Sequence, residues 1–235
     1  MRYQFVNLNG KPVFGEYEQA DSFREGLAAV RINGKWGYID ETGTLILPAI
    51  YDSAFFFSEG LAYVEKGADE MFIRKDGKVA FSIPADATRG PSGGMVIAGR
   101  TTFQDDNFKV GIMDNTGRIL LSPEYDAVEP FSEGLAAFQN AELWGYLDMS
   151  GKPAIRAQFD AAKSFASGLA AVEINGKWGF IDKTGRLVIP AIYNAVRQPF
   201  SKGIAWVELD GRNIFINEAG DVKFTLEGDK IIKSS

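Results

Sequence analysis

The sequence predicts an all-β protein made of tandem repeats, and three observations support this prediction. The stretch from Phe23 to Gly43 returns almost unchanged from Phe165 to Gly185. A glycine precedes a small apolar segment every 34 or 35 positions, with one longer step of 40, at Gly26, Gly60, Gly94, Gly134, Gly168 and Gly203. Short apolar runs alternate with glycine-containing turns, which is typical of antiparallel β-structure. Repetition at this period indicates an array whose copies contact mainly their neighbours.

The first complete copy contains three predicted strands, which we name A, B and C. They cover residues 27–32, 36–40 and 44–47. Asn33-Gly34 follows strand A, and this pair favours the positive φ angles of a tight hairpin turn. Strand C is expected to end at Pro48, because proline cannot donate a hydrogen bond to a β-ladder. A return segment, residues 50–54, then leads to Phe57 and the next copy.

The whole chain is expected to form one repeat array. Its approximate units are residues 1–25 (partial), 26–59, 60–93, 94–133, 134–167, 168–202 and 203–235, the last of which lacks a return segment. A period near 34 residues is shorter than that of standard propeller blades. The chain also has one more B–C hairpin than it has A strands. Both observations favour an open, curved β-solenoid, and a closed, propeller-like ring is the alternative.

Composition limits the possible chemistry. The chain has 25 lysine and arginine residues against 31 aspartate and glutamate residues, a net charge of −6, so nucleic acid is not an expected partner. It has neither cysteine nor histidine, which excludes disulfides, thiolate metal sites and Ser-His-Asp catalysis within this chain. We expect no cofactor and no metal site. No apolar run is long enough to span a membrane, so we expect no membrane insertion. A cytoplasmic location is expected unless a leader was removed.

Two sets of recurring acids could carry chemistry. The turn after strand B holds Asp40, Asp114, Asp148 and Asp182, and the position before the strand A glycine holds Glu25, Glu59 and Glu133. The first set could bind calcium, and the second could supply the two carboxylates of a glycoside hydrolase. Arg74 interrupts the first set and Ser167 interrupts the second. We therefore expect turn-capping aspartates, no catalytic residue and no enzyme activity.

The third copy departs from the repeat and is the first candidate for partner binding. It has six more residues between Gly94 and Gly111 than the first copy has between its corresponding glycines. Assigned to the A–B hairpin, these residues predict an enlarged loop over residues 99–108. Insertions in repeat proteins often lie on the binding face, although a tolerated surface insertion is the alternative. The predicted contact residues are Arg100, Phe103, Asp105, Asp106 and Phe108.

Two further copies carry a large aromatic residue where strand A otherwise has alanine. Tyr63 and Trp206 are these residues. An exposed face would make them contact residues for a partner. A buried face would make them fillers of the space left at Glu70 and Asn213, where the same two copies lack a tryptophan. Both possibilities stay open at this point, and the second is favoured.

A Trp-Gly pair opens strand B at Trp36-Gly37, Trp144-Gly145 and Trp178-Gly179. The tryptophans could stack on sugars, but a repeated aromatic residue more often fills the core between units. With the Tyr/Phe-Ile/Leu-Asp that follows, these pairs make the chain resemble the bacterial WG (Trp-Gly) repeat family over nearly all of residues 3–225. The resemblance implies a repeat array and supplies no catalytic residue. We expect a scaffold that binds another protein, with carbohydrate binding as the alternative and a carboxylate-based hydrolase as the third reading.

Overall fold

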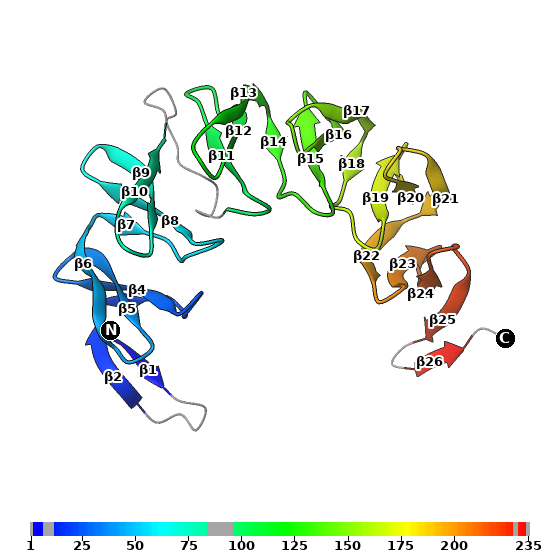
Figure 1. The fold of residues 1–235 in the computed structure, drawn as a ribbon. Helices are drawn as coiled ribbons and strands as arrows, with labels where there is room; N and C mark the ends of the chain where they lie inside the picture. Colours follow the sequence, from blue (N-terminus) through cyan, green and yellow to red (C-terminus); the bar gives the residue numbers. More distant parts are fainter. Residues whose placement is uncertain (1, 7–11, 84–95, 228–229, 234–235) are drawn as a thin grey trace. The chain divides into compact units, whose positions relative to one another are not determined.

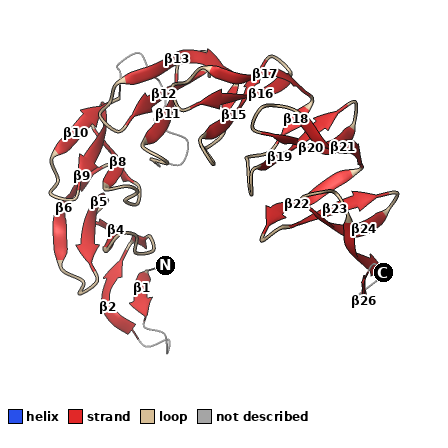
Figure 2. Cartoon of the chain, turned by 45° about the vertical axis from the view of Figure 1, so that its right-hand side comes forward, coloured by secondary structure: helices blue, strands red, loops and turns tan. Residues whose placement is uncertain are grey.

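The chain is a series of small antiparallel β-sheets (Figure 1). The computed structural model describes residues 2–6, 12–83, 96–227 and 230–233. All regular structure in these ranges is β-strand, arranged in seven sheets (Figure 2). No helix that could cross a membrane occurs among the described residues. The chain divides into two compact units, residues 1–124 and 125–235.

The first compact unit begins with a hairpin and continues with three sheets. The hairpin is formed by β1 (Tyr3–Val6) and β2 (Pro12–Tyr17). The next sheet contains β3 (Gln19–Ala20), β4 (Leu27–Ile32), β5 (Lys35–Asp40) and β6 (Leu45–Tyr51). It is followed by β7 (Ser53–Ala54), β8 (Leu61–Lys66), β9 (Asp69–Arg74) and β10 (Val79–Ser82). The third sheet contains β11 (Arg100–Gln104), β12 (Val110–Asp114) and β13 (Ile119–Tyr125).

The second compact unit contains three sheets in the same strand order. The first is β14 (Ala127–Val128), β15 (Leu135–Asn140), β16 (Leu143–Asp148) and β17 (Pro153–Phe159). The second is β18 (Ala161–Ala162), β19 (Leu169–Ile174), β20 (Lys177–Asp182) and β21 (Leu187–Tyr193). The last is β22 (Ala195–Ser201), β23 (Ile204–Leu209), β24 (Arg212–Asn217), β25 (Val222–Glu227) and β26 (Lys230–Lys233).

Strands A and B lie where the sequence places them. In the first complete sheet, β4 pairs with β5 in an unbroken register from Leu27↔Asp40 to Ile32↔Lys35. The connecting turn has φ angles of 50° at Asn33 and 80° at Gly34, the left-handed values that Asn-Gly favours. The predicted A–B hairpin is therefore confirmed.

Strand C is longer than predicted, and Pro48 does not end it. The strand β6 runs through the proline to Tyr51, and the ladder to β5 is irregular between Leu47 and Tyr51. Two properties of β6 make the proline acceptable: β6 is at the edge of its sheet, and it bulges away from a regular ladder. Proline removes a hydrogen bond only where a partner strand needs its N–H, so the predicted strand end was wrong.

The return segment adds a fourth strand that the sequence analysis missed. After β6, residues 53–54 form β7, which pairs with strand A of the next sheet through Ser53↔Glu65 and Ala54↔Val64. The same two-residue strand recurs as β3, β14 and β18. Sheets therefore begin in the return segment, some residues before the strand A glycine that we used to mark the units.

The insertion in the third copy enlarges the A–B turn, but less than predicted: residues 105–109 connect β11 to β12, whereas Asn33 and Gly34 alone connect β4 to β5. Gly99 has the role assigned to Gly94: it has a φ of 67° and follows Ala98 at 51°, as Gly60 follows Glu59. The bridge Ile97↔Arg100 repeats the bridge at the start of β8. Gly94 lies outside the described residues. The first half of the predicted loop of residues 99–108 is instead strand β11, and the loop itself is the five-residue turn 105–109.

Successive residues of strand B face two different cores. Tyr38 packs against Phe57, Ala62 and Val64 of the following sheet. Ile39 points to the opposite face and packs with the aromatic cluster of the β1–β2 hairpin. Tyr38 and Ile39 are both fully buried, so the β3–β6 sheet contributes one layer to the core before it and one to the core after it.

Candidate functional site

The hairpin turn between β11 and β12 carries an unusual residue. Phe108 has a φ of 63° and is 57% exposed. Bulky residues rarely adopt left-handed backbone angles. The corresponding turns hold Asn33, Ala141, Asn175 and Asp210 at positive φ. Among the described residues, Phe108 is the one aromatic side chain at such a position.

Asp105 fixes the shape of this turn. Its carboxylate Oδ1 accepts hydrogen bonds from the backbone N–H groups of Asn107 at 3.0 Å and Lys109 at 2.8 Å. The Phe108 N–H donates to the carbonyl of Asp105 at 3.0 Å. Asp106 is exposed beside these residues. Asp105 therefore positions Phe108 and Asp106, and its carboxylate is engaged in hydrogen bonds within the turn.

Two residues predicted for the same contact surface lie elsewhere. Phe103 is only 2% exposed and packs in a core cluster with Phe72 and Met113. This position of strand A faces the core, so Phe103 is not available to a partner and its prediction was wrong. Arg100 opens β11, is partly buried, and donates from Nη1 to the carbonyl of Gly99 at 3.0 Å. Arg100 therefore lies at the far end of the strand from the turn.

The structure favours compensation over partner contact at the two large aromatic residues of strand A. Tyr63 is 2% exposed, and its hydroxyl donates to the carboxylate of Glu70 at 2.7 Å. Burial and this carboxylate raise the pKa of Tyr63. Trp206 is partly buried and donates from Nε1 to the side-chain oxygen of Asn213 at 3.0 Å. In both cases the large residue binds the polar residue that replaces the tryptophan, so Tyr63 is not a contact residue.

The glutamates considered for acid–base chemistry join neighbouring sheets. Glu25 Oε2 accepts the N–H of Gly60 at 3.0 Å and forms an ion pair with Lys75 at 3.2 Å. Burial raises the pKa of Glu25, but the hydrogen bonds from Lys75 and Gly60 outweigh it, and the pKa is lowered. Glu133 repeats the arrangement with the N–H of Gly168 and with Lys183. A lowered pKa and backbone partners suit a structural carboxylate rather than a proton donor.

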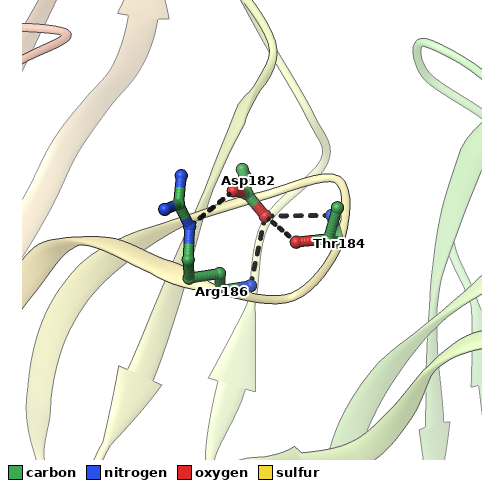
Figure 3. A network of polar contacts seen from close by, with 3 residues as sticks. All are labelled: Asp182, Thr184 and Arg186. Carbon is green, nitrogen blue, oxygen red and sulfur yellow. Dashed lines mark hydrogen bonds and ion pairs between the residues drawn. The ribbon is translucent and has the colours of Figure 1, made fainter.

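The aspartate after strand B caps its own turn (Figure 3). Asp182 Oδ1 accepts hydrogen bonds from the Thr184 N–H at 3.0 Å and from the Thr184 hydroxyl, and Oδ2 accepts one from Arg186 Nε at 3.1 Å. The hydroxyl bond is the main cause that lowers the pKa of Asp182 to about 2. Asp40, Asp114 and Asp148 bind in the same way. The turn-capping interpretation fits all four, and the described residues contain no group of three or more acids arranged to hold a metal.

The two residues of the Trp-Gly pair have different roles. Trp36 is partly buried at the margin of its cluster, whereas Tyr38 is the fully buried aromatic residue on that face. Trp144 and Trp178 pack against their clusters in the same way, so the tryptophans line the margin of the core between sheets and Tyr38 lies at its centre. A Cβ atom on Gly37 would lie 2.7 Å from the carbonyl oxygen of Leu47 and 2.8 Å from the nitrogen of Ala49. The glycine is required because the bulged strand C crosses directly over it.

Sequence reasoning missed a set of exposed aliphatic side chains on strand C. They are Leu45, Ile46 and Ile50 on β6, and Leu187, Val188 and Ile192 on β21. These strands are edges of their sheets, so the side chains border unpaired backbone groups. A proline within an apolar run is the signal that could have identified an edge strand.

Comparisons with known proteins agree with a repeat array. The WG containing repeat matches residues 5–36, 36–68, 111–143, 144–178 and 178–212. Residues 1–4, 69–110 and 213–235 lie outside these matches, and the two longer stretches begin where Glu70 and Asn213 stand in place of the tryptophan. No curated protein matches the sequence.

Several solved structures are similar at low identity. The computationally designed Ika8 protein is 14% identical with a TM-score of 0.48, covering 91% of this chain and 75% of that chain. BamB from Moraxella catarrhalis is 12% identical with a TM-score of 0.47, covering 88% of this chain and 75% of that chain. The WD40 β-propeller domain of Doa1 is 12% identical with a TM-score of 0.38, covering 91% and 84%. The five matched repeats cover most of the sequence, and the chain belongs to the WG containing repeat family.

Proposed function

We propose that this chain is a non-enzymatic repeat scaffold that binds another protein, with Phe108 as the central contact residue. The observation that supports the proposal is the exposure of Phe108 at a left-handed turn position, where asparagine would be less strained. Strained, exposed residues cluster at functional sites. Large aromatic side chains also supply much of the binding free energy at protein interfaces.

The residues around Phe108 suit a specific contact. Asp105 holds the turn in one conformation, so Phe108 is presented with little loss of backbone freedom on binding. Asp106, two residues earlier in the same turn, is exposed and adds a negative charge. A partner with an apolar pocket and a basic residue at its rim fits this pair.

Site-specific photocrosslinking in the native host tests the proposal. A benzophenone-bearing amino acid replaces Phe108 in one version of the protein and Asn33 in a control, because Asn33 occupies the matching turn of the first complete sheet. We expect one protein to crosslink from position 108 and not from position 33. Equal crosslinking from both positions, or none from position 108, would contradict the proposal.

The partner identified by crosslinking is then purified, and its affinity for this chain gives the second test. Phe108→Asn is expected to weaken binding about tenfold or more, since removal of a central aromatic residue costs about 2 kcal/mol. Asparagine adopts this backbone conformation at Asn33 and Asn175, so the variant is expected to fold. Unchanged affinity would show that Phe108 is not the contact residue.

Carbohydrate is the second candidate ligand, and the partial exposure of the Trp-Gly tryptophans favours it. Trp36, Trp144 and Trp178 are all partly buried, so none of them is fully withdrawn from solvent. Aromatic rings at sheet margins can stack on sugar faces. Binding of the intact protein to a glycan array, lost in Trp178→Ala, would support this candidate over protein binding.

Further parts of the proposal come from the sequence. We infer a cytoplasmic protein without catalytic residues, cofactor or metal, and with no nucleic acid partner. The open stack of sheets, rather than a closed ring, also remains a prediction. Small-angle X-ray scattering of the purified chain distinguishes these two forms.

A further inference from the structure

Hydrogen bonds of three kinds of side chain join successive sheets at three junctions: β3–β6 to β7–β10, β7–β10 to β11–β13, and β14–β17 to β18–β21. A serine before strand A donates to a backbone carbonyl of the next sheet, from Ser58 Oγ to Val96 O and from Ser132 Oγ to Phe165 O, both at 2.7 Å. These bonds occupy the same place in two different sheets. They are therefore a regular part of the junction between sheets rather than an isolated contact.

Glutamate and tyrosine supply the other two kinds. Glu59 accepts the N–H groups of Ala98 and Gly99 at 2.7 Å, as Glu25 and Glu133 accept those of Gly60 and Gly168. The buried Tyr38 hydroxyl donates to the Phe55 carbonyl at 2.7 Å, and Tyr146 donates to the Lys163 carbonyl at 2.8 Å. The β3–β6, β7–β10 and β14–β17 sheets are each joined to the following sheet by at least two of these three kinds of bond.

The junction between the β18–β21 sheet and the β22–β26 sheet departs at every one of these positions. Ala166 stands at the position of the donor serine, and Ser167 stands at the position of the glutamate. Phe180 replaces the tyrosine, and Glu218 replaces the lysine that forms an ion pair with that glutamate. Among the described residues, no side-chain hydrogen bond or ion pair of the kinds above crosses this junction.

Apolar packing is what holds the last sheet. Phe180 meets Phe200 edge to face at 4.9 Å between ring centroids, and Val207 and Ile216 pack in the same cluster. A single residue, Asn194, connects β21 to β22. Its side chain accepts the N–H of Asp210, which belongs to the last sheet itself. The connection can therefore turn without breaking a bond to the preceding sheet.

We propose that the β22–β26 sheet opens as a separate cooperative unit about Asn194 while the β14–β21 sheets stay folded. Regions joined by fewer specific interactions open at lower free energy than the molecule as a whole. Opening exposes the buried apolar face formed by Phe180, Phe200, Val207 and Ile216.

Hydrogen exchange of the intact chain, followed by mass spectrometry, tests the proposal. We expect peptides covering residues 204–217 to exchange at least about tenfold faster than those covering 169–182. Equal exchange in the two regions would overturn the proposal. Being the last sheet could by itself speed exchange, so a second protein is needed.

That protein restores the missing polar residues. Ala166→Ser, Ser167→Glu and Glu218→Lys together supply the serine, glutamate and lysine found at the preceding junction. We expect exchange of residues 204–217 to slow about tenfold in this variant and that of 169–182 to stay as it was. A sheet that is labile only because it is last would not respond. No slowing in a folded variant would therefore overturn the proposal.

A matched variant checks the reverse change. Ser132→Ala with Glu133→Ser removes the same bonds at the junction between the β14–β17 and β18–β21 sheets. We expect the exchange rate of residues 169–182 to rise toward that of the β22–β26 sheet. Unchanged exchange there would show that these bonds do not hold sheets together, and the proposal would fail.

Discussion

The hydroxyl of Tyr63 donates a 2.7 Å hydrogen bond to Glu70, the residue that stands where other copies carry the Trp-Gly tryptophan. The two lie on adjacent strands, β8 and β9, and the Tyr63 ring also packs against Phe72 at 5.8 Å. A tyrosine on strand A and a glutamate on strand B therefore stand at the positions that Ala29 and Trp36 occupy in the preceding sheet.

This exchange predicts strong coupling between two substitutions. Tyr63→Ala alone should destabilise the protein by about 3–5 kcal/mol, the usual effect of removing a buried aromatic ring. Glu70→Trp alone should cost about 1–3 kcal/mol, because two large rings then compete for one space. The double variant should recover most of both losses. Urea unfolding of the four proteins measures the coupling, and additive losses would show that the two positions do not compensate.

The glycine of the Trp-Gly pair is predicted to tolerate no side chain. A Cβ atom on Gly179 would lie 2.7 Å from the Ile189 carbonyl oxygen, whereas one on Gly168 would meet nothing within 4 Å. Gly168 has a φ of 77°, so Gly168→Ala should lower the free energy of unfolding by about 1–2 kcal/mol, the cost of an alanine in the left-handed conformation. Gly179→Ala should cost clearly more, because backbone must move. Thermal unfolding compares the two, and a smaller loss at Gly179 would refute the close approach.

Acid should weaken the turn at Asp182. The folded-state pKa of about 2 lies below the ordinary 3.8, so the carboxylate contributes stability that is fully present above 3.8 and is lost as pH falls toward 2. Asp182→Asn keeps an acceptor, as Asn217 does in the last sheet through the N–H of Asp221 at 2.8 Å. The melting temperatures of the two proteins should therefore converge between pH 4 and about 2. A constant difference over this range would contradict the assignment.

The prolines of strand C are predicted to prevent association. Pro190 lies in β21 between the exposed Val188 and Ile192, at the edge of its sheet. Pro190→Thr gives this edge an N–H group and a residue suited to strands, so it becomes a better template for another chain. We expect severalfold faster growth of light scattering on incubation of the folded variant. Equal scattering would show that the edge is protected by other means.

The sequence predicts regular parts of this fold well, because local chemistry determines them. The Asn33-Gly34 turn and the A–B register follow from backbone preferences that act over a few residues. The extent of strand C does not follow, because Pro48 is excluded only from a strand paired on both sides. Whether a strand lies at an edge is determined by the whole sheet, and the residues around the proline do not determine it.

The candidate site was predicted only in part, for a related reason. Phe108 and Asp106 are exposed as expected, but Phe103 lies in the core because Gly99, not Gly94, precedes strand A. Both glycines fit the spacing to within a few residues. The hydrogen-bonded bridge Ile97↔Arg100 distinguishes them, and it is a tertiary observation.

The two-residue return strand has a consequence for biosynthesis. Because β7 pairs with β8 through Ala54↔Val64 and β8 pairs with β9 through Leu61↔Arg74, every ladder of that sheet closes over a short distance along the chain. Pairings of this kind form quickly and need no distant segment. Each sheet can therefore fold as soon as its own strands have emerged from the ribosome, so that few unpaired strands are exposed during synthesis.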